Sequence, residues 1–399
     1  MVGGRGGRGR GRAGGVLLGM LALLAGCSSG SPAPPASPPV SAGPSAAATT
    51  PSCAERVLAG MSHDERVGQL FLFGLEENRL GPREVEGIRQ DHLGSVAFIE
   101  TTSVGSAAIR ETTDAVQALA TEANTGGVGF LVAANQEGGQ IQALRGSGFS
   151  TIPSAVDQGV LAPSDLRGMA RRWGEELLAA GVNFDFAPVL DVVPPGRDDE
   201  NEPIGVLERG YGHDPGTVSS HGVAFLRGMQ DAGVTTSAKH FPGLGRVVGN
   251  TDFTADVVDD ETTPDDPYLR PFADAIAGDV PFVMVALATY TRIDPDHLAV
   301  FSRAVIEDLL RGTLGFDGVV ISDDVGAAEA VAHVPAGERA VGFIEAGGDM
   351  VISKFVGPAR AMARAVRLRA EADPAFRSRV DASALRVLAA KDAAGLLPC

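Results

Sequence analysis

Short apolar segments alternate with longer amphipathic segments along most of the chain. Most of the short segments are continuously apolar, which is typical of parallel strands covered on both faces. The longer segments repeat apolar residues at spacings of three and four, as in residues 164–181 and 217–233, and this periodicity predicts amphipathic helices. The predicted strands cover residues 67–75, 94–100, 127–135, 181–190, 235–241, 281–287, 318–324 and 347–353.

Eight strand–helix units within about 345 residues predict a single α/β domain that folds as a TIM-type (β/α)8 barrel. A doubly wound open sheet is the alternative, because it is built from the same alternation of strands and helices. In the barrel, the residues directly after the strands line one mouth, and active sites of this architecture lie there.

Polar residues follow several of the predicted strands. Lys239 and Asp323 each end an apolar run, and an unpaired charge in a partly desolvated mouth is costly unless a partner or a ligand uses it. For Glu137, Asp191 and Asp324, a structural role in capping or in fixing a loop is as good an interpretation as a role in the site at the mouth. The polar residues after the strands are Asn135, Gln136, Glu137, Asp191, Lys239, His240, Asp323 and Asp324.

The first 26 residues have the pattern of an export signal. Four arginines between residues 5 and 12 precede an apolar run over residues 16–24, which is too short to span a bilayer. Ala25 and Gly26 directly before Cys27 resemble the lipobox of bacterial lipoproteins. This resemblance implies cleavage before Cys27, a diacylglycerol anchor on its thiol, and a location on the extracytoplasmic face of the cell membrane. The alternative is an ordinary signal peptide with a chance cysteine.

Residues 27–52 are almost wholly Ser, Pro, Ala, Gly and Thr, so we expect a solvated tether without a core. The folded domain is predicted over residues 53–399, with the two remaining cysteines, Cys53 and Cys399, at its ends. Outside the cytoplasm this pair is a candidate disulfide, because the ends of a barrel domain often lie close together. The alternative is two exposed thiols.

The charge of the chain argues against a nucleic acid as partner. The net charge is −17, and without the four arginines of the signal the chain has 29 basic against 50 acidic residues, a balance that repels phosphate backbones. We expect no metal and no cofactor, because the histidines lack the spacing of metal ligands and are better interpreted as surface or structural residues. These histidines are His63, His92, His213, His221, His297 and His333.

Six motifs follow one another along the chain, namely NQEGGQIQ (135–142), FAPVLDV (186–192), IGVLERGYGHDP (204–215), KHFPGLG (239–245), IDP (293–295) and VVISDDVGA (319–327). Their order and spacing resemble those of glycoside hydrolase family 3, and the chain is most similar to the single-domain β-N-acetylglucosaminidases of that family. The resemblance implies that Asp323 is the nucleophile that forms a glycosyl-enzyme. It also implies that Lys239, His240 and Arg209 hold sugar hydroxyls.

Two of the implied roles depend on neighbouring groups. The position of Asn135 usually holds an aspartate in the family, so Asn135 provides an uncharged form of this sugar contact. We expect Lys239 to help keep Asp323 ionised, because an opposite charge nearby favours the ionised carboxylate.

The proton donor is the point where the chain departs from the family pattern. Larger members take the acid/base from a second domain, which we do not expect after the eighth strand here. In the single-domain members the donor is a His on the loop after KHFPG, two residues after an Asp. An ungapped alignment from Lys239 places Asn250, Thr251 and Asp252 at these positions, so the His is missing.

We expect Asp252 to replace this His as acid/base, with Asn250 positioning it, because a carboxyl group in a water-poor loop can keep a proton to donate. Alternatively, Asp252 braces the loop of a catalytically weak or inactive glycan-binding lipoprotein. The expected function is a retaining β-N-acetylhexosaminidase, a lipid-anchored monomer that removes terminal β-linked N-acetylglucosamine from cell-wall, peptidoglycan-derived glycans. A β-glycosidase or phosphorylase of different sugar specificity is a further alternative.

Overall fold

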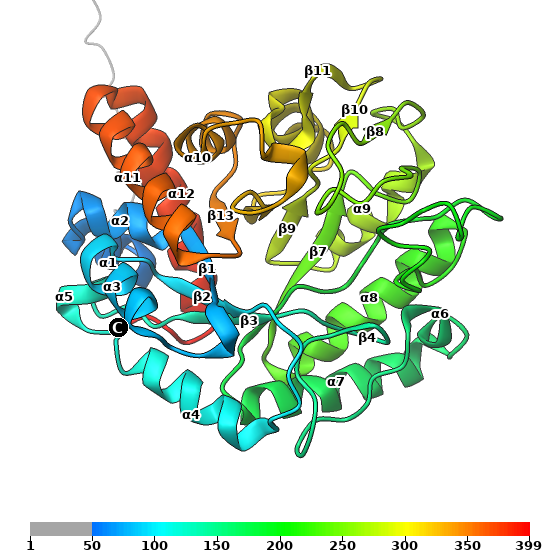
Figure 1. Ribbon diagram of the computed structural model, residues 1–399, viewed down its shortest axis with the longest axis horizontal. Coiled ribbons are helices and arrows are strands. Elements are labelled where there is room, and N and C mark those ends of the chain that lie inside the picture. Colours follow the sequence, from blue (N-terminus) through cyan, green and yellow to red (C-terminus); the bar gives the residue numbers. More distant parts are fainter. Residues whose placement is uncertain (1–49) are drawn as a thin grey trace, which may run out of the picture. The chain divides into compact units, whose positions relative to one another are not determined.

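Eight parallel strands close into a barrel in the computed structural model, which describes residues 50–399 (Figure 1). Each barrel strand lies within one of the segments predicted from the sequence, so the (β/α)8 prediction is confirmed. The last strand pairs with the first, Val351 with Phe71, which excludes the open sheet. In chain order the barrel strands are β1 (Phe71–Leu75), β2 (Ser95–Phe98), β3 (Leu131–Ala134), β6 (Phe184–Asp185), β7 (Thr235–Phe241), β9 (Phe282–Val285), β12 (Val319–Asp324) and β13 (Met350–Ser353).

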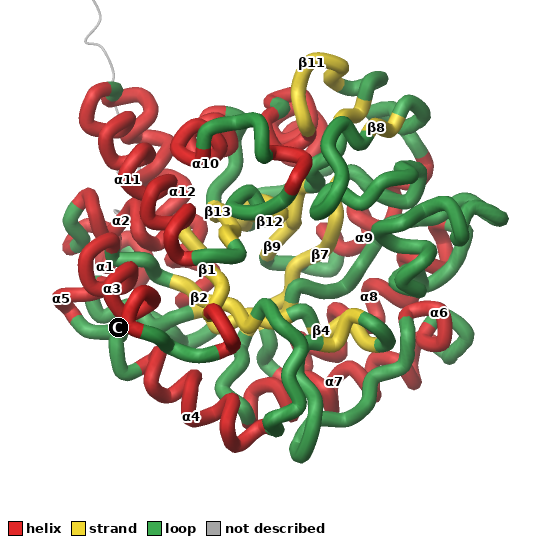
Figure 2. The backbone as a smooth tube through the Cα atoms, in the orientation of Figure 1, coloured by secondary structure: helices red, strands yellow, loops and turns green. Residues whose placement is uncertain are grey.

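One long helix follows each barrel strand, and a further helix ends the chain. Figure 2 shows these helices around the strands. Because both faces of each strand are covered, by helices outside and by side chains inside, the strands can be continuously apolar. The long helices are α3 (Pro82–Asp91), α4 (Ser106–Gln117), α7 (Pro163–Ala179), α8 (Pro215–Ala232), α9 (Arg270–Ala277), η4 (Ala304–Thr313), α10 (Ala336–Glu345), α11 (Val356–Ala372) and α12 (Pro374–Ala393).

Local sequence fixes the ends of these helices, as α8 illustrates. The side chain of Asp214 accepts a hydrogen bond from the backbone N–H of Thr217 at 2.9 Å, and Pro215 occupies the first helical position, where its missing N–H costs nothing. Gly233 ends the helix with φ of 90°, a conformation that glycine adopts readily.

Shorter elements connect the barrel units. The strands β4, β8 and β10 follow the carboxyl ends of barrel strands and so build up one mouth of the barrel. The short helices are α1 (Cys53–Gly60), α2 (His63–Gln69), α5 (Glu122–Thr125), α6 (Ala155–Gln158), η1 (Glu76–Asn78), η2 (Pro267–Leu269), η3 (Ala299–Phe301) and η5 (Glu329–Val331). The short strands are β4 (Gln136–Gly138), β5 (Ile141–Gln142), β8 (Val258–Asp259), β10 (Thr289–Tyr290) and β11 (Asp294–Leu298).

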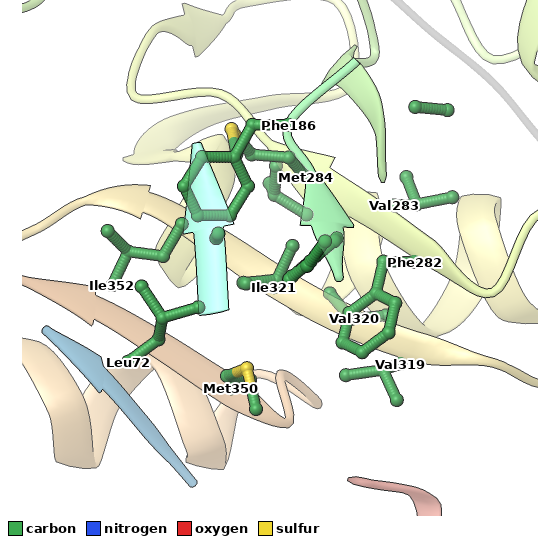
Figure 3. Packing of buried hydrophobic residues seen from close by; sticks show 14 of the residues in the cluster. Leu72, Phe186, Phe282, Val283, Met284, Val319, Val320, Ile321, Met350 and Ile352 are labelled. Carbon is green, nitrogen blue, oxygen red and sulfur yellow. The ribbon is translucent and has the colours of Figure 1, made fainter. Parts of the chain in front are cut away.

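Apolar side chains fill the inside of the barrel. Figure 3 shows Leu72, Phe186, Met284 and Ile352 among the buried residues that pack there. All four also line the cavity at the mouth of the barrel, so the same packed side chains form the floor of that cavity.

The opposite end of the barrel, where the strands begin, holds both ends of the domain. Cys53 in α1 and Cys399 are joined by a disulfide, with their Cα atoms 6.0 Å apart. The side chain of Lys391 in α12 is fully buried at this end. Its Nζ donates to Oε1 of Gln69 at 2.6 Å and to the carbonyl oxygen of Gly94 at 2.7 Å.

The predicted signal over residues 1–26, the lipid-anchor residue Cys27 and the tether up to residue 49 lie outside the described residues. Within residues 50–399, no helix has the length and apolar character needed to cross a membrane.

Candidate active site

A cavity of about 450 Å3 opens at the carboxyl ends of the barrel strands. Polar side chains surround its apolar floor, a combination typical of small-molecule sites. The structure brings to this cavity all seven residues that the sequence predicts for catalysis, substrate binding and loop support, namely Asn135, Arg209, Lys239, His240, Asn250, Asp252 and Asp323.

The buried carboxylate of Glu137 in β4 holds two of the predicted sugar-binding cations. Its Oε1 lies 2.6 Å from Nζ of Lys239, and its two oxygens accept from Nε and Nη2 of Arg209 at 2.8 Å each. Burial alone would raise the pKa of Glu137, but the charges of Arg209 and Lys239 outweigh it and lower that pKa to about 2. The permanently ionised Glu137 therefore keeps both cations in place, and the loop-fixing alternative describes it well.

Lys239, which the sequence analysis expected to help keep Asp323 ionised, is paired with other groups in the structure. Its Nζ contacts Glu137 and donates to Oδ1 of Asn135 at 2.7 Å. The electrostatic link to Asp323 instead involves Arg209. Burial would lower the pKa of Arg209, but the charges of Glu137, Asp191 and Asp323 raise it. β4 brings the carboxylate of Glu137 to within 2.6 Å of Lys239, and an effect of Lys239 on the ionisation of Asp323 stays a prediction.

The imidazole of His240 is hydrogen-bonded to the fully buried carboxyl group of Asp191. Oδ2 of Asp191 lies 2.7 Å from Nδ1 of His240, and its Oδ1 accepts the backbone N–H groups of His240 at 3.2 Å and Leu244 at 2.7 Å. Nε2 of His240 lies 3.4 Å from Nη2 of Arg209. A proton on Nδ1 satisfies both contacts, because Nδ1 then donates to Asp191 and Nε2 accepts from Arg209.

The two acids at the end of β12 have different surroundings. Asp323 lines the cavity, and its Oδ1 accepts the backbone N–H of Asp324 at 2.8 Å. Oδ1 of Asp324 accepts the backbone N–H groups of Gly326 and Lys354, both at 2.8 Å, and so ties the loop after β12 to the loop after β13. Burial, assisted by the charges of Asp323 and Asp252, raises the pKa of Asp324 to about 6. Asp324 therefore fixes the loops beside the candidate nucleophile Asp323.

The loop after β7 carries Asp252 to the cavity and is pinned by its backbone. The carbonyl oxygens of Thr251 and Asp252 accept the N–H groups of Ala330 at 3.1 Å and Glu329 at 3.2 Å, beyond the end of β12. Oδ1 of Asn250 accepts the backbone N–H of Asp252 at 3.0 Å. Asn250 thus supports Asp252 as expected, but through the backbone rather than through the carboxyl group.

The surrounding protein raises the pKa of Asp252. The loss of solvation is the main cause, and the negative charge of Asp323 adds to it, while the charges of Arg209 and Lys354 oppose it. The side chain nevertheless remains exposed at the rim, where a substrate can reach it. The raised pKa of Asp252 favours the protonated form that a general acid needs, and the carboxyl group is placed at the cavity.

Sequence reasoning missed four residues at or near the site. Lys354, Phe253 and Phe355 line the cavity. Lys354 directly follows β13, so the rule that found the other polar residues also points to it. Asp185 at the end of β6 is fully buried, and burial raises its pKa to about 7. Its Oδ1 accepts the backbone N–H of Gln136 at 2.9 Å, which fixes the start of β4 and hence Glu137.

Comparison with known proteins bears on the chemistry of this cavity. Residues 62–390 match the family model described as the glycosyl hydrolase family 3 N-terminal domain. A β-hexosaminidase of Alkalilimnicola ehrlichii is 35% identical over 302 residues, covering 71% of this chain and 79% of the relative. A β-hexosaminidase of Stenotrophomonas maltophilia is 32% identical over 295 residues, covering 71% and 82%. The crystal structure of a β-N-acetylhexosaminidase from Beutenbergia cavernae is 48% identical with a TM-score of 0.82, and the match covers 83% of this chain and 99% of that one.

Proposed function

This chain belongs to glycosyl hydrolase family 3, and from that membership we propose that its cavity is the active site of a retaining β-N-acetylhexosaminidase. The substrate is a glycan with a terminal β-linked N-acetylglucosamine. The observation that carries the proposal is the meeting of two acids, from two different segments of the chain, at one apolar-floored cavity. Asp323 comes from β12, and Asp252, with its raised pKa, comes from the loop after β7.

In the first step of the proposed reaction, the carboxylate of Asp323 forms a bond to the anomeric carbon while the bond to the leaving oxygen breaks. Asp252 donates its proton to that oxygen, so the leaving sugar departs as a neutral alcohol. In the second step Asp252, now ionised, takes a proton from water. The resulting attack on the anomeric carbon releases Asp323 and restores both acids. Retention needs the two carboxyl groups about 5 to 5.5 Å apart during the reaction.

The remaining polar residues hold the sugar ring for this attack. Arg209 and Lys239 present donors that Glu137 has already oriented, and Asp191 fixes His240. Asn135 reaches the cavity beside Lys239. Because these groups are positioned before the substrate arrives, less ordering is needed during the reaction, and such positioning supplies several kcal/mol to catalysis.

A panel of chromogenic β-glycosides tests this function. We expect the purified protein to release the aglycone from the β-N-acetylglucosaminide faster than from the β-glucoside. A slowly hydrolysed 5-fluoro N-acetylglucosaminyl fluoride should label Asp323, to be read by mass spectrometry of the peptide that contains it. A folded protein that is inactive on every member of the panel would favour a glycan-binding role, and a faster reaction with the β-glucoside would favour a different sugar specificity.

We also propose that the protein is a lipoprotein on the extracytoplasmic face of the bacterial membrane and that its substrates come from the cell wall. The arginine-rich start, the short apolar run and Cys27 support the anchor. The disulfide between Cys53 and Cys399 supports an oxidising compartment. Substitution Cys27→Ala should abolish membrane retention of the mature protein in cell fractionation, and unchanged retention would contradict the anchor.

A further inference from the structure

The exposed aromatic side chains of this protein are concentrated at one place. Within residues 50–399, the large apolar side chains that are exposed include two aromatic ones, Phe253 at 79% and Phe355 at 38%, and both line the active-site cavity. The other exposed side chains of this group are valines and one leucine. A single exposed apolar residue needs no explanation, but two aromatic rings at the rim of one cavity indicate a binding surface.

Phe253 lies beside the candidate acid, because it is the residue after Asp252 on the loop that is pinned to the segment after β12. Phe355 stands two residues after the end of β13 and lines the same cavity. Its neighbour Lys354 acts on the carboxyl group of Asp252, which links Phe355 to the rim that carries the candidate acid.

Lys354 brings a positive charge to the same rim. Its Nζ lies 5.8 Å from the centre of the Phe355 ring, and its charge acts on the carboxyl group of Asp252. The exposed Lys354 has no carboxylate within 4 Å among the described residues, whereas Lys239 and Arg209 deeper in the cavity share the charge of Glu137. Among the described residues Lys354 therefore takes part in no ion pair, and its ammonium group is open to an anion at the rim.

We infer that Phe253, Phe355 and Lys354 form the subsite for the leaving-group sugar, and that this subsite favours a leaving sugar that carries a carboxylate. The inference rests on the proposed glycosidase function. A pyranose ring has an apolar face of C–H groups that packs on an aromatic ring, and aromatic surfaces supply contact area at low cost in conformational entropy. The positive charge of Lys354 then favours the binding of anionic over neutral leaving sugars.

Three substrates isolate the subsite. N-acetyl-β-glucosaminyl fluoride has no leaving sugar, and the β-1,4-linked disaccharides of N-acetylglucosamine with glucose and with glucuronic acid differ only by a carboxylate. For Phe253→Ala we expect the ratio of kcat/KM for the glucose disaccharide to that for the fluoride to fall about tenfold, mainly through KM, as a loss of about 1.4 kcal/mol requires. Val160→Ala, which alters an exposed side chain that does not line the cavity, is the matched control and should leave the ratio unchanged.

The charge preference has its own test. The wild-type enzyme should prefer the glucuronic acid disaccharide to the glucose disaccharide, and Lys354→Met should reduce this preference about fivefold, whereas Lys354→Arg should keep it. High salt should reduce the preference of the wild type as well, because the rim is exposed.

Two results would overturn the inference. One is an equal loss on all three substrates in Phe253→Ala, which would mean that the loop merely holds Asp252. The other is the absence of any charge preference in the wild type, or a preference that Lys354→Met leaves intact. Failure of the proposed function has a different signature, because the wild type would then hydrolyse neither the fluoride nor the disaccharides.

Discussion

Two lysine side chains are buried at opposite ends of the barrel, and their surroundings differ. At the mouth, Lys239 is 2% exposed and lies 2.6 Å from the carboxylate of Glu137. At the other end, Lys391 is fully buried, but its Nζ meets only an amide oxygen and a carbonyl oxygen. Burial without a counter-charge lowers the pKa of Lys391 to about 7.

The difference shows that burial alone does not make a lysine functional. The mouth supplies a carboxylate, so Lys239 has a counter-charge and lines the cavity that a ligand enters. The closed end supplies only neutral oxygens, so Lys391 approaches the neutral form and its role is confined to packing α12 against the start of the barrel. Substitutions at the mouth should therefore change turnover, and those at the closed end should change stability.

The largest effect on turnover is expected from Asp323→Asn at the mouth. Without an ionised oxygen to attack the anomeric carbon, kcat should fall at least about 10⁴-fold on every substrate, activated or not. Thermal unfolding should be nearly unchanged, because Asp323 braces only the neighbouring backbone N–H. Turnover of an activated aryl glycoside at more than a small fraction of the wild-type rate would assign the nucleophile to another residue.

Asp252→Ala should have a large effect that depends on the leaving group. A disaccharide needs a proton on its leaving oxygen and should react about 10³-fold more slowly, whereas the first step on an activated aryl glycoside should be largely spared. Added azide should partly restore turnover of the activated substrate, since azide attacks the glycosyl-enzyme without a general base. Near-normal hydrolysis of the disaccharide would instead make the loop after β7 a structural one.

Glu137→Gln tests the pairing that distinguishes Lys239 from Lys391. The two cations lose their shared counter-charge and their fixed positions, so kcat/KM should fall about 10²-fold, with some loss of stability from the unpaired buried charges. Glu175→Gln is the matched control, because Glu175 also pairs with an arginine, Arg171 at 2.9 Å, but on the exposed surface. Equal effects of the two substitutions on kcat/KM would show that the pairing at the mouth does not serve catalysis.

Lys391→Met should have the smallest effect on turnover and should alter the pH dependence of stability. The pKa of Lys391 is about 7 in the folded protein and about 10.4 in the unfolded chain, so between these values the unfolded chain binds one more proton. Over this window the free energy of unfolding of the wild type should therefore rise with pH relative to that of Lys391→Met. The rise should reach up to about 1.4 kcal/mol per pH unit. Urea titrations of both proteins from pH 6 to 10 measure the difference, and parallel pH profiles would contradict the lowered pKa.

The sequence predicted the barrel from local order along the chain, and it predicted Asn135, Lys239, His240 and Asp323 for the cavity because they follow strands. Arg209, Asn250 and Asp252 were predicted from the family resemblance instead. Continuous apolar runs marked each strand, and the residues after the strands are brought together by the closure of the barrel. The pairing of Lys239 with Glu137 was not predictable in this way. The two residues are far apart in sequence, and only the turn of the chain into β4 brings that carboxylate beside Lys239.

Aromatic residues at the rim were missed for a different physical reason. Phe253 and Phe355 look in sequence like any other apolar residue near an element end, and only their exposure in the fold separates them from the core. The backbone role of Asn250 was likewise hidden, because the sequence gives the residue type but not which donor its side-chain oxygen accepts.

The disulfide between Cys53 and Cys399 makes the folded domain a covalent ring of nearly all its residues. A protease that cuts one surface loop of such a ring opens it but does not divide it into two pieces. The fragments on either side of the cut stay joined through the sulfur atoms, and the packed barrel keeps them in register. As long as the disulfide is not reduced, the enzyme can therefore be nicked and remain one molecule.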